Sequence, residues 1–141
     1  MITENLKLTG HVTVAINGEV VQEIPNLVVT AGKGYVASRM KDTTDGAMSH
    51  MAVGTDSTAA AAGDTALGTE SGRVSLTSST VSANVITYVA TFPAGTATAA
   101  LTEAAILNAS SGGTMLCRTV YSTVNKGASD AMTVTWAITA S

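Results

Sequence analysis

Apolar and polar residues alternate along much of the chain, as they do in strands that bury one face. The alternation is clearest in three segments, at residues 11–16, 86–92 and 132–138. Asn17 and Gly18 follow the first segment, and both central positions of a type I′ turn require positive φ. This pair therefore predicts a hairpin that joins the first segment to a partner strand at 19–24.

Shorter apolar or alternating segments predict further strands, at residues 27–29, 48–53, 101–108 and 115–121. Turn-forming residues separate these segments. Several short strands at such spacing favour an all-β fold, either an antiparallel β-sandwich or a jelly-roll-like barrel. A parallel α/β fold is not expected, because it needs helices that alternate with the strands.

One short helix is predicted near residues 30–41. Thr30 can cap its N-terminus, because a threonine hydroxyl can accept a hydrogen bond from the first turn. The apolar residues that would share one face of this helix are Tyr35, Val36 and Met40. The basic residues Arg39 and Lys41 lie near its C-terminal end, where the helix dipole favours cations.

A long segment of small residues, 54–72, separates the predicted strands in the middle of the chain. Loops of this length in compact domains are usually functional, so this one is expected either to hold a partner or to be a mobile surface loop. The domain organisation that follows is a single β domain over residues 1–141, with an N-terminal arm at 1–8.

Composition suggests a protein that packs against neighbours. Alanine, threonine, serine and glycine make up about half of the chain, and 12% of residues are charged, against roughly 25% in ordinary globular domains. Because 45% of residues are hydrophobic, the chain is expected to fold. Depletion of charge is typical of the centre of a protein interface. A monomer with a surface rich in threonine and serine is the alternative.

Several function classes are not expected. The net charge of −3 and the scattered basic residues disfavour nucleic-acid binding, which needs clustered lysine and arginine. Polar residues interrupt the uncharged segment 74–102 too often for a membrane span. Residues 1–5 lack the basic start and apolar stretch of a secretion signal. Cys117 is the single cysteine and is expected to be a buried thiol.

The candidate chemistry is sparse, and no enzyme activity, cofactor or small-molecule substrate is expected. His11 and His50 are far apart in the chain and are expected to be surface or hydrogen-bonded residues rather than bases. Ser49 beside His50 lacks the sequence context of a catalytic nucleophile. The loop aspartates lack the spacing of a calcium-binding loop and are expected to form turns; they are Asp42, Asp45, Asp56 and Asp64.

Glu103 is the most unusual carboxylate, because it interrupts an otherwise apolar strand. Arg73 and Arg118 are its candidate partners in an internal ion pair. Glu70 is the second carboxylate that stands out. A structural salt bridge is the favoured interpretation, and an acid/base couple is the alternative.

A series of short motifs covers the second two thirds of the chain. In order, the motifs are SHMAVGT at 49–55, GDTALGTE at 63–70, ITYVATF at 86–92, LTEAAILN at 101–108, GTMLCRT at 113–119, VNKG at 124–127 and MTVTWAI at 132–138. In this order, over roughly residues 26–140, the chain resembles a family of small virion structural proteins of tailed bacteriophages. The resemblance implies a small β domain, usually oligomeric, that is made in the host cytoplasm and becomes part of the virion.

The specific function expected from this resemblance is that of a capsid decoration, or cement, protein that stabilises the assembled head. Its partners would be the major capsid protein and further copies of itself, as a trimer or a dimer. The residues expected to contact a partner lie in the small-residue loop and in the arm: Thr55, Asp56, Ser57, Thr58, Asp64, Thr65, Leu67, Thr69, Ile2 and Leu6.

Two other interpretations remain open. A tail, baseplate or fibre component would also be a threonine-, serine- and glycine-rich β protein, although a fibre shaft would show internal repeats. A carbohydrate-binding module would need exposed aromatic residues, and the chain has three tyrosines, one phenylalanine and one tryptophan. Most of these lie at predicted core positions.

Overall fold

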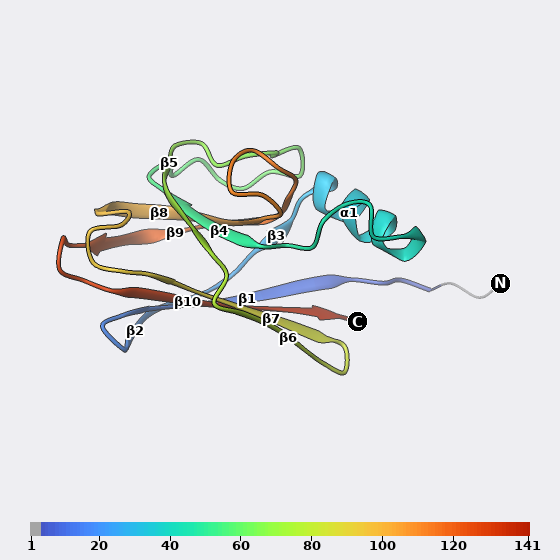
Figure 1. The fold of residues 1–141 in the computed structure, drawn as a ribbon, viewed down its shortest axis with the longest axis horizontal. Helices are drawn as coiled ribbons and strands as arrows, with labels where there is room; N and C mark the ends of the chain where they lie inside the picture. Colours follow the sequence, from blue (N-terminus) through green and yellow to red (C-terminus); the bar gives the residue numbers. More distant parts are fainter. Residues whose placement is uncertain (1–3) are drawn as a thin grey trace.

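The computed structural model describes residues 4–141 and shows two β-sheets packed face to face, with a helix at one end (Figure 1). The elements in chain order are β1 (Leu8–Ile16), β2 (Glu19–Pro25), β3 (Leu27–Val28), α1 (Thr30–Lys41), β4 (His50–Gly54), β5 (Glu70–Ser75), β6 (Ser78–Ser82), β7 (Val85–Phe92), β8 (Ala99–Leu107), β9 (Met115–Lys126) and β10 (Met132–Ala140). Within the described residues, no helix is long and apolar enough to cross a membrane.

Each sheet has five strands, and every pair of neighbouring strands is antiparallel. The first sheet has the order β2-β1-β10-β7-β6, and the second has the order β3-β9-β8-β4-β5. The predicted β-sandwich with one short helix is therefore confirmed. The two sheets do not close into a barrel, so the barrel alternative is wrong.

The hairpin predicted at the start of the chain is present. Asn17 has φ 50° and Gly18 has φ 85°, as a type I′ turn requires, and β1 pairs with β2 on either side of them. The Asn17 side chain also donates to Asp130 Oδ1 (2.9 Å) and accepts from the Ala131 N–H (3.0 Å). These bonds fasten the hairpin to the turn before β10.

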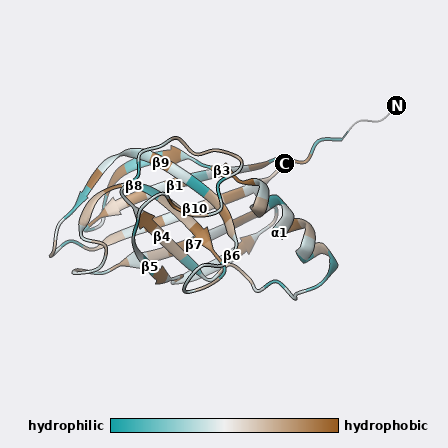
Figure 2. Ribbon diagram, turned by 90° about the horizontal axis from the view of Figure 1, so that it is seen from above, coloured by the Kyte–Doolittle hydropathy of each residue, from teal (hydrophilic) through white to brown (hydrophobic). Residues whose placement is uncertain are grey.

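The main core lies between the sheets, and Trp136 is at its centre on the first sheet. Its side chain is fully buried, between Val12 of β1 and Tyr88 of β7 in the strand register. Phe92 lies on the same neighbouring strand, β7, and is also fully buried. Hydrophobic and hydrophilic residues recur in short stretches along the strands (Figure 2). Along β10, buried residues alternate with half-buried ones, so the alternation in the sequence marks the buried face of this strand.

The second sheet is covered on its outer face as well. A second cluster of buried apolar residues joins its strands, and the start of α1 and the loop before β5 pack against it through Ala31 and Leu67. The buried members of this cluster are Val29, Ala52, Ala105, Leu107 and Met115. Burial on both faces explains why β8 is a nearly continuous apolar run rather than an alternating one.

The helix has the predicted bounds but a different start. Val29 is the N-cap and makes no side-chain capping bond, so the predicted cap at Thr30 is wrong. The Thr30 N–H instead donates to the Ala62 carbonyl of the loop (2.8 Å), which satisfies one of the free donors of the first turn. Gly32 lies so close to the Leu116 carbonyl that a Cβ would collide with it. A glycine therefore lets the helix rest directly on β9.

The predicted apolar face of the helix is only partly buried. Tyr35 and Val36 pack against the main core, whereas Met40 is 84% exposed. Arg39 and Lys41 do lie in the last turn, and the Arg39 guanidinium donates to the Asp45 carbonyl (2.8 Å). The exposed Met40 lies beside grooves on both sides of the helix.

Two strands, β5 and β6, lie where no strand was expected. Their sequences, ESGRVS and SSTVS, each contain a single apolar side chain, a valine, and so have no alternating apolar pattern. The first part of β5 falls within the segment 54–72 that was predicted to be a loop, so the true loop is limited to residues 55–69. Both are edge strands, which have only one neighbour and need fewer apolar residues.

Candidate functional site

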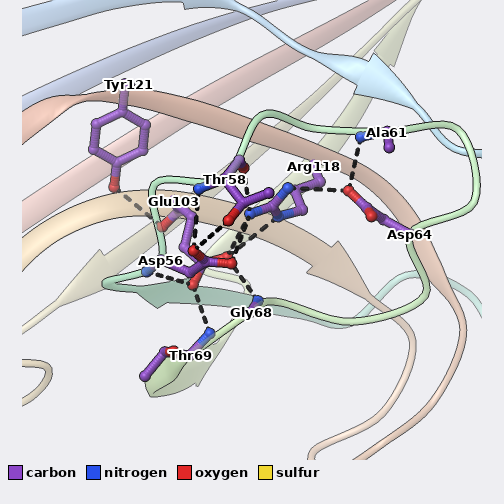
Figure 3. Close-up of polar contacts among 9 residues, drawn as sticks. All are labelled: Asp56, Thr58, Ala61, Asp64, Gly68, Thr69, Glu103, Arg118 and Tyr121. Carbon is purple, nitrogen blue, oxygen red and sulfur yellow. Dashed lines mark hydrogen bonds and ion pairs between the residues drawn. The ribbon is translucent and has the colours of Figure 1, made fainter.

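The loop at residues 55–69, between β4 and β5, lies over the outer face of the second sheet and is fastened there by two buried charged residues (Figure 3). We call residues 55–69 the clamped loop. The charged residues are Glu103 of β8, which is fully buried, and Arg118 of β9, which is 2% exposed. The two lie on neighbouring strands of the second sheet.

The Glu103 carboxylate accepts hydrogen bonds from both ends of the clamped loop. Oε2 accepts from the Asp56 N–H (3.0 Å) and the Thr69 N–H (2.8 Å), and Oε1 accepts from the Gly68 N–H (2.9 Å). One carboxylate thus satisfies three backbone donors that begin and end the loop (Figure 3). Hydrogen bonds to a charged acceptor are stronger than neutral ones.

Arg118 holds the middle of the clamped loop. Its guanidinium donates to Glu103 Oε1 from Nε (3.2 Å) and from Nη2 (3.0 Å), which confirms the internal salt bridge predicted for Glu103. Nη1 donates to Asp64 Oδ2 (3.0 Å), and Nη2 also donates to the Thr58 carbonyl (3.0 Å). The other candidate partner, Arg73, pairs with Glu70 instead (2.7 Å).

Tyr121 of β9 adds a contact beneath the pair. Its hydroxyl donates to the Glu103 carbonyl (3.3 Å). Burial raises the pKa of Tyr121 well above its usual range, and the nearby Glu103 charge acts in the same direction. The hydroxyl therefore stays protonated and remains a donor at any physiological pH.

The aspartates of the clamped loop form turns, as predicted. Asp56 Oδ1 accepts from the N–H (3.0 Å) and the hydroxyl (2.9 Å) of Thr58, and these bonds hold the pKa of Asp56 below its usual value. Asp64 Oδ2 accepts from the Ala61 N–H (2.9 Å) as well as from Arg118. Outside the loop, Asp42 accepts from the Thr44 N–H (3.0 Å) in the same manner.

Glycine is required where the chain approaches these carboxylates. A Cβ on Gly68 would collide with the Asp56 carboxylate. A Cβ on Gly54 would collide with the Thr69 carbonyl and with Glu103 Oε2. Two glycines of the motif region are thus explained by the close packing of the loop on the buried pair.

The residues predicted to contact a partner fall into three groups. Three of them are half-buried and have side-chain contacts that hold the loop: Asp56, Asp64 and Leu67. The side chains that remain exposed are Thr55, Ser57, Thr58, Thr65 and Thr69. Leu6, 74% exposed, lines a separate groove beside α1, and Ile2 lies outside the described residues.

That separate groove has a volume of about 470 Å³. It lies between the N-terminal segment, β3 and α1, and its apolar lining includes Leu6, Leu8, Leu27 and Met40. Of the predicted arm, Lys7 already pairs with Ser141 through two backbone hydrogen bonds (2.7 and 2.8 Å), and Leu8 belongs to β1. The described part of the arm is therefore residues 4–7.

The two histidines contact polar side chains, and the single cysteine is buried. Nδ1 of His50 contacts the Ser49 hydroxyl (2.7 Å), and its Nε2 contacts the Ser75 hydroxyl (3.4 Å). His11 pairs with Glu23 at the surface (3.3 Å). Cys117 is fully buried, as predicted, and burial raises the pKa of its thiol. Among residues 4–141 there is no group of three side chains suited to hold a metal ion.

Glu103 and Arg118 were predicted from the sequence as a candidate internal ion pair, but the loop that this pair holds was not predicted. A carboxylate inside an apolar strand was the signal for a buried pair. That the pair fastens residues 55–69 could not be read from the sequence, because most of the bonds involve backbone groups of the loop.

The sequence matches no protein-family model, and neither a curated protein nor a solved structure matches the chain.

Proposed function

We propose that this protein is a non-enzymatic structural component of a bacteriophage virion, and specifically a capsid decoration protein that stabilises the assembled head. The motifs along residues 49–138 support the assignment to a virion, through their resemblance to small phage structural proteins. The clamped loop supports a binding role, and it is the observation on which the proposal chiefly rests.

The clamped loop has the properties of a preformed binding surface. Its backbone is fixed by Glu103 and Arg118, so little conformational entropy is lost when a partner binds. Its charged side chains, Asp56 and Asp64, are occupied with internal bonds. The exposed side chains are short and uncharged and let a partner approach the backbone closely.

The partner surface follows from this chemistry. An uncharged surface of small residues binds through apolar contacts and main-chain hydrogen bonds, and such binding depends only weakly on salt. The major capsid protein in its assembled shell is the proposed partner, because several copies meet there and form a composite surface. A protein that binds only the intact shell stabilises it by mass action.

A binding experiment with matched variants tests the proposal. Purified protein should bind expanded shells at a fixed stoichiometry and show little affinity for capsid monomers. Ser57→Lys and Thr65→Lys place a long charged side chain on the exposed side of the clamped loop and should weaken binding at least tenfold. Ser129→Lys, in the exposed turn before β10, is the control and should bind like the unmodified protein.

The comparison between variants also separates binding from folding. All three lysine variants should melt at the temperature of the unmodified protein, because each position is exposed. Equal binding by Ser57→Lys, Thr65→Lys and the control would show that the clamped loop is not part of the interface with the shell. Absence of binding to shells by the unmodified protein would contradict the decoration role itself.

A further inference from the structure

The sandwich has an unprotected edge at β6. A free edge strand presents unpaired N–H and C=O groups, and proteins usually block it with charge, proline or a very short strand. Among the edge strands, β2 carries Glu19, Glu23 and Pro25, and β5 carries the Glu70–Arg73 pair. The fourth edge, β3, has only two residues.

By contrast, β6 has none of these protections. Its sequence is Ser-Ser-Thr-Val-Ser, all five residues are exposed, and Val81 is 69% exposed. The strand lies within the uncharged segment 74–102, so two copies of it can approach without charge repulsion. An edge without charge or proline leaves its N–H and C=O groups open to pairing with another strand.

The strand register identifies which backbone groups of β6 are free. The Ala140 N–H donates to the Asn84 carbonyl (2.9 Å). Along an antiparallel strand, successive residues bond alternately to one neighbouring strand and to the other, so the N–H and C=O groups of Ile86 and Tyr88 also point toward β10. The intervening residues of β7 therefore bond to Ser78, Thr80 and Ser82. The N–H and C=O groups of Ser79 and Val81 are left pointing to the free edge.

This edge is also held in place. The Asn84 side chain donates to the Ala140 carbonyl (2.9 Å), so two hydrogen bonds fasten the β6–β7 turn to the end of β10. The strand is thus ready to accept a partner without reordering, which lowers the entropic cost of pairing.

An apolar groove continues from the edge toward the helix. It has a volume of about 410 Å³ and lies between α1 and the inner face of β6 and β7. Ser79, Ile86, Tyr88 and the exposed Met40 are among its lining residues. Val81 lies opposite Ile86 in the register, and so on the same face as this groove.

We infer that β6 pairs with β6 of a second copy, antiparallel and about a two-fold axis through Thr80. In this register Ser79 lies opposite Val81 of the second copy, and the free groups of both form roughly four main-chain hydrogen bonds. The same pairing places each Val81 beside Ser79 of the other copy, at the rim of its groove. A second copy fits because the strand is complementary to itself in this register.

Disulfide trapping tests the register directly. The two Thr80 residues form a non-hydrogen-bonded pair with Cα atoms about 4.5 Å apart, within the range that a disulfide spans. Thr80→Cys should therefore give a covalent dimer on mild oxidation, seen on a non-reducing gel. In Ser82→Cys the two thiols lie about 13 Å apart along the strand, at ~3.3 Å per residue, so this control should stay monomeric on the gel.

Sedimentation velocity tests the surface without a cross-link. Val81→Lys should raise the dissociation constant of the dimer at least tenfold. Val20→Lys changes an exposed valine on β2, the opposite edge strand of the same sheet, and should leave this constant unchanged. A monomeric unmodified protein at high concentration, or equal cross-linking of both cysteine variants, would overturn the inference. Because these measurements use the purified protein alone, their outcome does not depend on whether it binds capsids.

Discussion

The buried ion pair gives the sharpest stability prediction, through the substitution Glu103→Gln. Glutamine keeps the size of the side chain, so the change leaves no cavity and acts on charge and hydrogen bonding alone. The amide replaces one of the two carboxylate oxygens with an NH₂ group, so either the Asp56 and Thr69 N–H groups or the Gly68 N–H and Arg118 lose their acceptor. The Arg118 charge then stays buried with Asp64 (3.0 Å) and Asp56 (3.7 Å) as its remaining acidic partners.

The expected cost follows from what is left unpaired. Removing one partner of a buried ion pair costs about 3–5 kcal/mol. The contacts of Arg118 with Asp64 and Asp56 offset part of this cost, so we expect a loss of about 3 kcal/mol. For a domain of this size that corresponds to a fall in Tm of roughly 10 °C. Urea unfolding followed by the fluorescence of the buried Trp136 measures the free energy of unfolding directly.

Two comparisons make this prediction specific. Glu70→Gln breaks the more exposed pair with Arg73 and should cost about 1 kcal/mol or less. Arg118→Met combined with Glu103→Gln should cost less than the sum of the single changes, because no unpaired charge remains buried. A loss below about 1 kcal/mol for Glu103→Gln, or strict additivity in the double variant, would refute the view that this pair fastens the loop.

Three further predictions follow from other parts of the structure. Trp136→Ala removes the largest fully buried side chain and should cost about 3–5 kcal/mol in urea unfolding; a red-shifted emission of native Trp136 would contradict its burial. Gly32→Ala should destabilise the protein because the Cβ collides with the Leu116 carbonyl, whereas Gly34→Ala, with open space around it, should stabilise it by about 0.5–1 kcal/mol. Hydrogen bonds from the Gly127 N–H and, to a smaller extent, from the Asn17 side chain lower the pKa of Asp130 in the folded protein. Ionised Asp130 therefore stabilises the folded state above the unfolded pKa of about 3.9, and this stabilisation is lost as pH falls through the lower folded pKa. Melting curves from pH 7 to 3 should therefore fall less steeply for Asp130→Asn, and identical curves would contradict this role.

The sequence predicted those parts of the fold in which side chains decide the structure. Strands β1, β7 and β10 alternate because one face is buried, and the turn at Asn17-Gly18 needs residues that accept positive φ. The helix bounds were also correct. Thr30 is not the cap because the helical hydrogen bonds begin one residue earlier, with the Lys33 N–H bonded to the Val29 carbonyl. The Thr30 N–H bonds to the Ala62 carbonyl, which is distant in the chain.

The parts that could not be predicted depend on backbone contacts and on edges. Strand β6 has no apolar alternation because it has one neighbour and an exposed face. The clamped loop is ordered by hydrogen bonds from its own backbone to Glu103, and such bonds leave little trace in residue type. What the sequence did show was the anomaly at their centre, a carboxylate within an apolar strand.

The proposed decoration protein would lie on the outside of an assembled phage head, and imaging of immunogold-labelled virions tests this location most directly. We predict label distributed over the capsid surface, with virions that lack the protein bursting at a lower temperature than complete ones. Label confined to the tail or its tip would contradict a decoration role and would favour a tail, baseplate or fibre component instead.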